Sequence, residues 1–398
     1  MRTRLSVLAA LVVGSALTAT GATSHGSAVK LVVSPSTALL DQPIDVRVSG
    51  LRPGRKISLE ATTHDALGER WHSRLAYKAD EHGVVDTRRH MRVFWSLEPV
   101  KKTAIPSIFI PTAGPTRVVV RAVIKGHSVA AGEVVRLEQA ADVSRKDTTL
   151  ANEGFVGTYF APALGAPRPA VLQLGGSYGG HGDLPAALLA SHGYPTLALA
   201  YFKEPGLPQT LQDVPLEYFA KALHWLAAQP GVDSNRVLIY GVSRGGEAAL
   251  LLGATYPELI HGVIACTPSA DVNPAYPGPG AAWTLAGRPV PLGPIPVWQI
   301  AGPVFATGGG KDLVWPSAHA VYEIADRARA HGRPDIGGQV YPDAGHGVGY
   351  GIPNLPVYGR VIKLGNHFIG VGGTPGANVR AWADSWPRVL RFIATMPN

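Results

Sequence analysis

The chain has 398 residues, of which 46% are hydrophobic and 16% are charged. This composition is typical of a globular protein with one or two domains, and it excludes disorder over most of the length. The net charge of +8 is scattered along the chain, so the sequence gives no indication of a nucleic-acid-binding surface.

The first segment of the chain is apolar. Two arginines precede an apolar run from Leu5 to about Leu17, and small residues follow, with cleavage expected after Ala22 or Ala28. This pattern predicts a secretory signal peptide over residues 1–28. A membrane anchor is the alternative, but the run is shorter than the ~20 residues that span a bilayer. We therefore expect an exported protein, secreted or in the cell envelope, with no stable membrane span once this segment is removed.

Residues 29–140 are predicted to form an immunoglobulin-like β-sandwich. Short runs of alternating apolar residues are separated by turn signals such as Arg52-Pro53-Gly54, and this spacing is typical of sandwich strands. The runs are Leu31–Val33, Ile44–Val48, Ile57–Ala61 and Val118–Val123. None of them resembles a reaction centre.

Residues 150–398 have a different pattern, in which buried-type apolar runs alternate with amphipathic helices. Such alternation is typical of a mostly parallel sheet covered on both faces, and its order here is that of an α/β-hydrolase. Strands are predicted at residues 156–160, 170–174, 196–200, 237–240, 263–266, 304–307 and 339–341, and helices at 183–189, from 215, after 245, at 317–330 and around 382–393. The Pro- and Gly-rich segment 268–296 is too irregular for a core element, and we expect it to form part of a lid or substrate wall.

The pentapeptide Gly241–Gly245 lies between a predicted strand and a predicted helix. It has the form Gly-x-Ser-x-Gly, with Ser243 at its centre. In a nucleophile elbow this tight turn lifts the serine Oγ clear of the sheet, and the flanking glycines avoid steric clashes. Because the preceding strand and the following helix are both present, the pattern predicts that Ser243 is a nucleophile.

Two later loops have the residues that would activate such a serine. Asp312 follows a late strand through the loop Gly308-Gly309-Gly310, and His346 follows the last strand. The chain order serine, aspartate, histidine is that of the α/β-hydrolases. We expect His346 to act as general base and acid, and Asp312 to fix the tautomer of the imidazole.

Alternatives exist for the acid and the base. Asp335 and Asp343 are the rival carboxylates, but Asp343 lies on the same loop as the histidine and cannot easily reach the far nitrogen of its ring. His319 is the rival imidazole, within a predicted helix.

Amide donors for an oxyanion hole are predicted at two places. One is the backbone N–H of Arg244, the residue after the nucleophile. The second is expected in the loop Gly175–Gly180, with the amide of Gly176 preferred and Ser177 the nearest polar side chain. The alternatives for this loop are a flexible connection or a phosphate-binding loop, although the Lys-Ser/Thr ending of the latter is absent.

These residues, together with longer segments, resemble the family of acyl-CoA thioesterases and bile acid-CoA:amino acid N-acyltransferases. The resemblance covers nearly all of the chain after the signal segment. It rests on Leu40–Val46, Ser49–Gly54, Tyr77–Asp86 and Phe94–Leu97 in the first half, and on Leu188–Tyr194, Ala198–Phe202, Pro215–Phe219, Gly372–Pro375 and Asp384–Trp386 in the second.

The resemblance implies a catalytic triad of Ser243, Asp312 and His346. It also implies a serine-dependent acyl hydrolase of the acyl-CoA thioesterase type, which cleaves a small-molecule acyl thioester or ester. The bile-acid transferases of the family have a cysteine nucleophile, and serine favours hydrolysis because water readily attacks an acyl-serine ester. Where many members have Ser-Lys-Gly-Gly, this chain has arginine as the second residue, which keeps the positive charge.

Three other functions stay open. Export favours an exported carboxylic ester hydrolase, because acyl-CoA is a cytoplasmic metabolite. Transfer to an amine, as an acyl-CoA:amino acid N-acyltransferase, is the second, and an inactive secreted binding module is the third. We expect no metal and no cofactor, and the single cysteine, Cys266, is expected to be buried and without a catalytic role.

Overall fold

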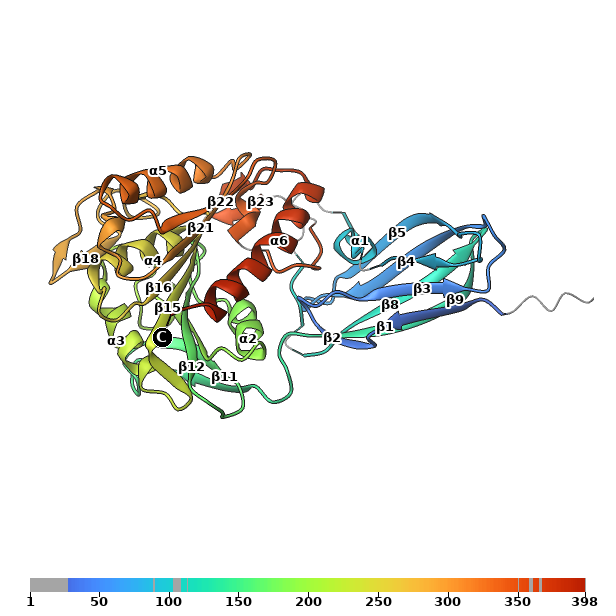
Figure 1. Ribbon diagram of the computed structural model, residues 1–398, viewed down its shortest axis with the longest axis horizontal. Helices are drawn as coiled ribbons and strands as arrows, with labels where there is room; N and C mark the ends of the chain where they lie inside the picture. The colour runs from blue at the N-terminus through green and yellow to red at the C-terminus, as the bar shows by residue number, and fades with distance from the viewer. Residues whose placement is uncertain are drawn as a thin grey trace, which may run out of the picture.

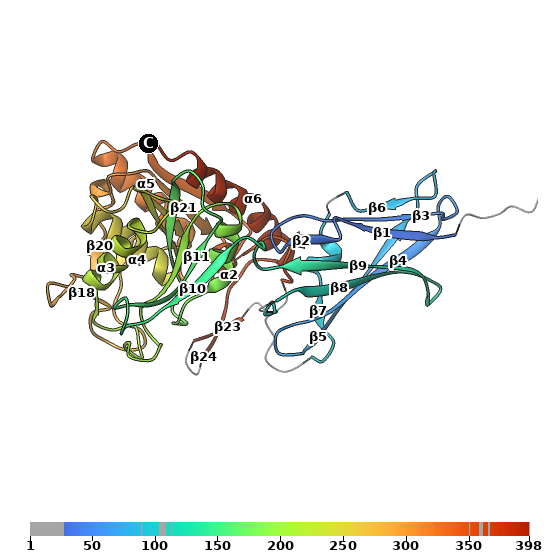
Figure 2. The ribbon, with the colours of Figure 1, turned by 90° about the horizontal axis from the view of Figure 1, so that it is seen from below.

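The computed structural model describes residues 28–88, 90–102, 109–112, 114–349, 351–357, 361–364 and 367–397. The predicted signal segment therefore lies outside the described residues, apart from Ala28. The described chain folds into an amino-terminal domain made mainly of β-strands and an α/β carboxy-terminal domain, which lie side by side (Figure 1, Figure 2). None of the helices in these ranges is both long enough and apolar enough to cross a bilayer.

The amino-terminal domain consists of two sheets that share one hydrophobic core. One sheet has the strand order β1-β3-β6 and the other β2-β9-β8-β4-β5-β7. Val48 of the first sheet and Leu59, Trp71 and Val120 of the second are fully buried in this core. The elements are β1 Lys30–Ser34, β2 Thr37–Leu39, β3 Asp45–Ser49, β4 Lys56–His64, β5 Arg70–Lys78, β6 Val85–Asp86, α1 Arg92–Trp95, β7 Glu98–Pro99, β8 Thr116–Ile124 and β9 His127–Leu137.

The carboxy-terminal domain is built on an eight-stranded mixed sheet of order β10-β11-β13-β12-β15-β16-β21-β22. Strands β13 to β22 of this order run parallel, and β10 and β11 pair antiparallel at one edge. This is the α/β-hydrolase-like sheet that the sequence predicts. Its strands are β10 Ser144–Thr148, β11 Val156–Ala161, β12 Arg168–Leu174, β13 Thr196–Ala200, β15 Val232–Val242, β16 Gly262–Cys266, β21 Val304–Gly309 and β22 Ile336–Tyr341.

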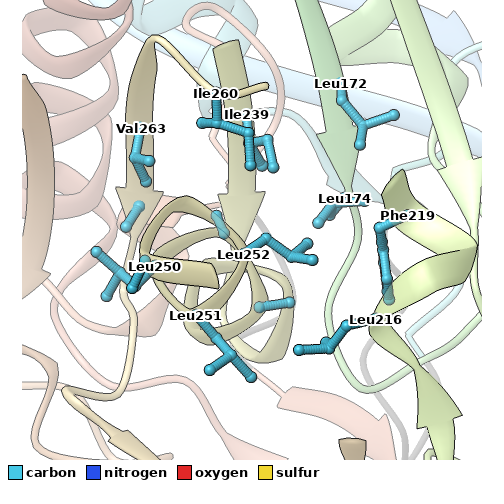
Figure 3. Close-up of a cluster of buried hydrophobic side chains, with 14 of the residues drawn as sticks. Leu172, Leu174, Leu216, Phe219, Ile239, Leu250, Leu251, Leu252, Ile260 and Val263 are labelled. Carbon is cyan, nitrogen blue, oxygen red and sulfur yellow. The ribbon is translucent and has the colours of Figure 1, made fainter. Parts of the chain in front are cut away.

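Helices cover both faces of this sheet (Figure 1). The chain contains α2 Asp183–Ser191, α3 Leu216–Ala227, α4 Arg244–Thr255, α5 Ser317–Ala330 and α6 Pro375–Ala394. Helices α3, α4 and α5 pack on one face, and α2 and α6 pack on the other. Figure 3 shows Leu250 and Leu252 of α4 beside Ile239 and Val263 of the sheet. Burying such side chains contributes about 1.5–3 kcal/mol each, so the sheet holds α4 firmly against the strand that carries Ser243.

The last helix begins earlier than the sequence prediction around residue 382. Helix α6 starts at Pro375, and the Thr374 side chain accepts a hydrogen bond from the amide of Ala377 at 3.2 Å. A threonine cap followed by proline at the first helical position is a strong start signal. The prediction was wrong at this end because it relied on apolar spacing, although the cap was readable in the sequence.

The segment 268–296 is more ordered than the sequence suggested. It contains β17 Asp271–Val272, β18 Trp283–Leu285, β19 Arg288–Pro289 and β20 Gly293–Pro294, and β18 pairs with β14 Val214–Pro215. Trp283 is fully buried, with its ring centre 6.0 Å from that of Phe219 in α3. The segment supplies no strand to the eight-stranded sheet, but a single large aromatic side chain anchors this otherwise irregular loop in the core.

A buried aspartate connects the two domains. Asp41 of the amino-terminal domain places Oδ2 2.5 Å from Nε2 of His192 and accepts a hydrogen bond from the indole of Trp386 at 2.7 Å. Its backbone carbonyl accepts a bond from the Asn354 side chain at 2.8 Å. These contacts come from the residue that follows α2, from α6 and from a late loop, so several parts of the second domain hold the same residue of the first.

Glu138, in the connection between the domains, gives a prediction about pH. Burial raises its pKa to about 7, with Asp183 adding to the rise and Arg145 opposing it. The folded chain therefore keeps this proton at pH values where the unfolded chain loses it. The stability that this represents is fully present below about pH 4.5 and is lost as the pH rises through 7, about 1–2 kcal/mol after allowance for solvent screening.

We expect Glu138→Gln to raise the melting temperature at pH 8 by a few degrees and to leave it unchanged at pH 4.5. The exposed residue Glu258 provides the control, because Glu258→Gln should have the same small effect at both pH values. Thermal unfolding followed by circular dichroism measures both variants. Equal melting shifts for Glu138→Gln at pH 4.5 and pH 8 would contradict the assignment.

Candidate active site

Ser243 occupies a strained turn between β15 and α4. Its backbone has φ of 57° and ψ of −118°, and its amide donates to the carbonyl of Cys266 at 2.8 Å. A non-glycine residue in this region of backbone space costs about 1–3 kcal/mol, and such strain is concentrated at functional sites. A methyl group at Gly241 would overlap the carbonyl of Gly245, and one at Gly245 would overlap the carbonyl of Gly175. Close backbone contact therefore requires both glycines of the pentapeptide.

The structure brings together the three side chains singled out in the sequence. His346, in the short 3-10 helix η2 His346–Gly349, places Nε2 3.0 Å from Oγ of Ser243. Its Nδ1 lies 2.8 Å from Oδ2 of Asp312, in the loop after β21. The Ser243 residue is 3% exposed, and the His346 and Asp312 side chains are 0% and 1% exposed. The hydrogen-bonded series is therefore almost completely shielded from water.

The rival residues lie outside this series. Asp335 pairs with Arg333 at 2.8 Å, and Asp343 is exposed. The side chain of His319 is 69% exposed and lies 3.6 Å from Glu323 on the same helix. These three side chains are surface groups.

Asp312 is held by contacts that the sequence analysis missed. Its Oδ1 accepts from the amides of Val314 at 2.9 Å and Trp315 at 3.3 Å. The hydroxyl of Ser317 donates to Oδ2 at 2.6 Å and accepts from the amide of Gly309 at 3.1 Å. A carboxylate with this many hydrogen-bond donors keeps a fixed orientation. The sequence held one signal for the contact with Ser317, because this serine lies at the start of a predicted helix, five residues after Asp312.

The loop that carries His346 is held from α6. Asn378 accepts a hydrogen bond from the amide of Gly345 at 2.9 Å and donates to the carbonyl of Gly372 at 3.3 Å. The His346 amide donates to the carbonyl of Val371 at 2.6 Å. The indole of Trp315 meets the imidazole edge to face, with 5.6 Å between ring centres. The position of the imidazole thus depends on α6, which lies about 30 residues further along the chain.

The predicted oxyanion donors lie on two segments that touch. Arg244 is the first residue of α4, so its N–H has no partner within the helix. The loop after β12 reaches the elbow at Gly175, whose carbonyl approaches Gly245 and accepts a hydrogen bond from the Tyr201 hydroxyl at 2.6 Å. The loop that contains Gly176 and Ser177 therefore starts beside Ser243, and the donor roles of these two residues stay predictions.

The side chain of Arg244 points into the protein and not towards solvent. It is 4% exposed and donates to Oε2 of Glu247 at 2.8 Å, and Glu247 is fully buried. Glu247 also accepts from the indole of Trp283 at 2.9 Å and from the amide of Asn273 at 3.1 Å. Burial raises the pKa of Glu247, and the charge of Arg244 opposes that rise. This cluster connects segment 268–296 to α4, the helix that begins directly after Ser243.

Cys266 is buried, as the sequence predicts, beneath the elbow. Burial raises the pKa of its thiol to about 11, with hydrogen bonds to Thr307 and Tyr240 opposing the rise. The thiolate is the reactive form of cysteine. This thiol is therefore a poor nucleophile at neutral pH.

Ser317 provides a test of how Asp312 is held. Ser317→Ala removes the 2.6 Å hydrogen bond to Oδ2. We expect kcat for ester hydrolysis to fall about tenfold, because a hydrogen bond to a charged group contributes about 1.5–3 kcal/mol and part of it orients the imidazole. Stopped-flow or steady-state assays measure kcat and KM, and Ser317→Thr, which keeps a hydroxyl, should recover most of the activity. Unchanged kcat in Ser317→Ala would contradict this role.

Comparisons with known proteins identify the family of the chain. The family model of the acyl-CoA thioester hydrolase/BAAT N-terminal region matches residues 41–149, and that of the BAAT/acyl-CoA thioester hydrolase C terminal matches residues 214–275 and 289–396. Similar proteins include acyl-coenzyme A amino acid N-acyltransferase 1 of Mus musculus, at 28% identity over 92% of this chain and 97% of the relative.

Two thioesterases are similarly related. Acyl-coenzyme A thioesterase 6 of Mus musculus is 29% identical over 89% of this chain and 93% of its own length, and acyl-coenzyme A thioesterase 1 of Homo sapiens is 28% identical over 92% and 96%. Among solved structures, a putative dienelactone hydrolase from Klebsiella pneumoniae covers 64% of this chain and 99% of its own, with a TM-score of 0.46 and 19% identity. The two family models together match more than half of the residues, and the chain therefore belongs to the acyl-CoA thioester hydrolase/BAAT family.

Proposed function

We propose that the protein is a serine-dependent acyl hydrolase of the acyl-CoA thioesterase type, which works through an acyl-Ser243 intermediate. The observation that carries the proposal is the buried series Ser243 Oγ to His346 Nε2 at 3.0 Å and His346 Nδ1 to Asp312 Oδ2 at 2.8 Å. Full-length similarity to proteins named acyl-coenzyme A thioesterases supports the choice of substrate class.

In the proposed reaction, His346 takes the proton of the Ser243 hydroxyl as Oγ attacks the carbonyl carbon of the acyl group. The negative charge then formed on the carbonyl oxygen is stabilised by the amides of Arg244 and Gly176. The imidazolium is stabilised by Asp312 and gives its proton to the departing thiolate or alkoxide. A water molecule, activated by the same imidazole, then hydrolyses the acyl-serine ester.

Transfer of the acyl group to an amine is the second candidate, because N-acyltransferases are among the relatives. Serine at position 243 favours water as the acceptor, since an oxygen ester is attacked by amines less readily than a thioester. Product analysis with glycine or taurine as acceptor distinguishes the two. If an amide is the main product, the protein is an acyltransferase and not a hydrolase.

Export is the third part of the proposal, and its support is the signal-like segment 1–28. An exported enzyme would meet carboxylic esters or envelope-linked acyl groups more often than acyl-CoA. Cell fractionation with the full chain and with a variant lacking residues 1–28 tests export, and an unchanged distribution would contradict it.

We also infer an immunoglobulin-like topology for the amino-terminal sandwich, on the basis of its strand lengths and turn spacing.

Two experiments test the activity. A fluorophosphonate probe should label Ser243 in the wild-type protein and should fail to label Ser243→Ala. A hydrolysis screen with acyl-CoA, p-nitrophenyl esters and lipid esters then identifies the leaving group. A folded protein that takes no label and cleaves none of these substrates would be an inactive binding module.

A further inference from the structure

The loop after β12 has little rigidity of its own. It runs from Gly175 to Gly180, and four of its six residues are glycine. Glycine adopts many backbone conformations at little steric cost, so the peptide unit between Gly175 and Gly176 rotates easily unless another group holds it. The N–H of that unit is the second donor predicted for the oxyanion hole. Its direction therefore depends on contacts made from outside the loop.

A buried tyrosine makes such a contact. The hydroxyl of Tyr201, the residue that follows β13, donates a hydrogen bond to the carbonyl of Gly175 at 2.6 Å. Tyr201 is 1% exposed, so little water can compete for this bond. A hydrogen bond is electrostatically stronger in such an environment than in water. The first residue of the glycine-rich loop is thus held from the neighbouring strand.

The bond to this carbonyl also acts on the predicted donor. The peptide bond between Gly175 and Gly176 is planar and trans, so the carbonyl of the first residue and the N–H of the second point in opposite directions within one rigid unit. A hydroxyl that fixes the carbonyl therefore fixes the direction of the N–H. Tyr201 thus acts on the donor through the backbone.

The ring of Tyr201 is itself held in place. Its centre lies 5.4 Å from that of Phe219 in α3 and 5.8 Å from that of Trp283. The indole of Trp283 donates to Glu247, which pairs with Arg244. Tyr201 therefore contacts the loop that contains one predicted donor and, through Trp283 and Glu247, the helix that begins with the other.

Neighbouring residues hold the far end of the same loop. The carbonyl of Phe202 accepts a hydrogen bond from the amide of Gly180 at 2.9 Å. The ammonium group of Lys203 donates to the carbonyl of Tyr178 at 3.1 Å, and this lysine is exposed. Both bonds lie beyond the first peptide unit of the loop, whereas the hydroxyl of Tyr201 acts on that unit directly.

From these contacts we propose that Tyr201 is a positioning residue of the oxyanion hole, whose hydroxyl directs the Gly176 N–H towards the oxygen of the tetrahedral intermediate. This inference rests on the proposed serine hydrolase function. Full negative charge develops on that oxygen only as Ser243 attacks the carbonyl carbon. Loss of the hydroxyl should therefore slow the chemical step and leave substrate binding almost unchanged.

The test replaces Tyr201 by phenylalanine, which removes the hydroxyl and keeps the ring. Loss of a complete oxyanion donor lowers kcat by about 10²–10³-fold. A donor that is present but misdirected should lose part of this effect, so we expect kcat to fall about 10- to 50-fold and KM to stay within about twofold. Steady-state kinetics with the best substrate of the hydrolysis screen measure both constants.

Tyr218→Phe is the matched control. The hydroxyl of Tyr218 also donates to a carbonyl at the end of β13, that of Ala200 at 2.7 Å, and it accepts from the amide of Val156 at 2.9 Å. Its loss removes hydrogen bonds beside the same strand end and leaves the bond to Gly175 intact. We expect kcat of Tyr218→Phe to stay within about twofold of the wild type, and thermal unfolding should show a loss of stability at least as large as that of Tyr201→Phe.

A transition-state analogue gives a readout that needs no turnover. Phenylboronic acid accepts the Ser243 oxygen at boron, and the tetrahedral anion so formed has an oxygen where the carbonyl oxygen of the intermediate would lie. Isothermal titration measures its dissociation constant. This constant should rise in Tyr201→Phe by about the factor by which kcat/KM falls, because both quantities depend on stabilisation of that oxygen. In Tyr218→Phe it should be unchanged.

The outcomes separate this role from the function on which it rests. If the wild type turns over the substrate and Tyr201→Phe keeps kcat and the boronic acid affinity within about twofold, the positioning role is wrong and the hydrolase function stands. Equal losses of kcat in Tyr201→Phe and Tyr218→Phe would indicate a general loosening of the strand end and would also overturn the role. If the wild type neither hydrolyses any substrate of the screen nor binds the boronic acid, the hydrolase function fails, and the positioning role fails with it.

Discussion

Replacement of Ser243 by alanine is expected to lower kcat for acyl-ester hydrolysis by about 10⁴-fold or more. Removal of the nucleophile from a serine triad leaves only the contribution of substrate binding and the oxyanion donors. In this chain Oγ of Ser243 lies 3.0 Å from the imidazole, and the nearby thiol of Cys266 is a poor substitute because burial raises its pKa to about 11. Steady-state kinetics on the best substrate of the screen measures the loss.

The control is the stability of the same variant. Alanine keeps the Cβ of serine, and the strained backbone at φ of 57° is common to both residues. The melting temperature of Ser243→Ala should therefore stay close to that of the wild type. A folded Ser243→Ala protein that retains more than about one tenth of wild-type kcat would show that another group attacks the substrate.

Removal of the buried charge at Glu247 is expected to lower the free energy of unfolding by about 3–5 kcal/mol. Breaking one side of a buried ion pair leaves the partner charge without compensation. Glu247→Gln keeps the shape of the side chain but leaves the guanidinium of Arg244, 4% exposed, without its anion. Urea unfolding followed by tryptophan fluorescence and circular dichroism measures the change.

A double variant separates charge from packing. In Arg244→Met/Glu247→Leu both charges are absent, and burying apolar side chains of similar size is often close to neutral. We expect this variant to be more stable than Glu247→Gln by at least about 2 kcal/mol. If Glu247→Gln alone unfolds at the same urea concentration as the wild type, the ion pair does not have the structural role described here.

The loss at Glu247 should also affect catalysis. Its carboxylate joins α4, which begins after Ser243, to Asn273 and Trp283 in segment 268–296. Loosening this contact should shift the position of the Arg244 amide and of the nearby part of segment 268–296. The same cluster explains why an arginine follows the nucleophile, a point that the sequence analysis attributed only to charge.

Much of the site was predictable from the sequence because its parts follow from strand order. Carboxyl ends of parallel strands meet at one edge of a sheet, so a serine after β15, an aspartate after β21 and a histidine after β22 converge whatever the intervening loops do. The glycines at 241 and 245 indicated the tight turn, and the structure shows the close contacts that require them.

Other features depend on contacts between distant residues. Asn378 holds the histidine loop across 33 positions, and Trp283 reaches Glu247 across 36. No local pattern indicates which buried polar side chain will meet another, because that choice depends on tertiary packing.

The most direct test of the central claim is mass spectrometry of the acyl-enzyme. The protein is mixed briefly with an acyl-CoA or p-nitrophenyl ester, quenched with acid and digested. The account predicts an acyl group on the peptide that contains Ser243, and its absence in Ser243→Ala. Sustained turnover with no such adduct, or with an adduct on a different residue, would contradict the account.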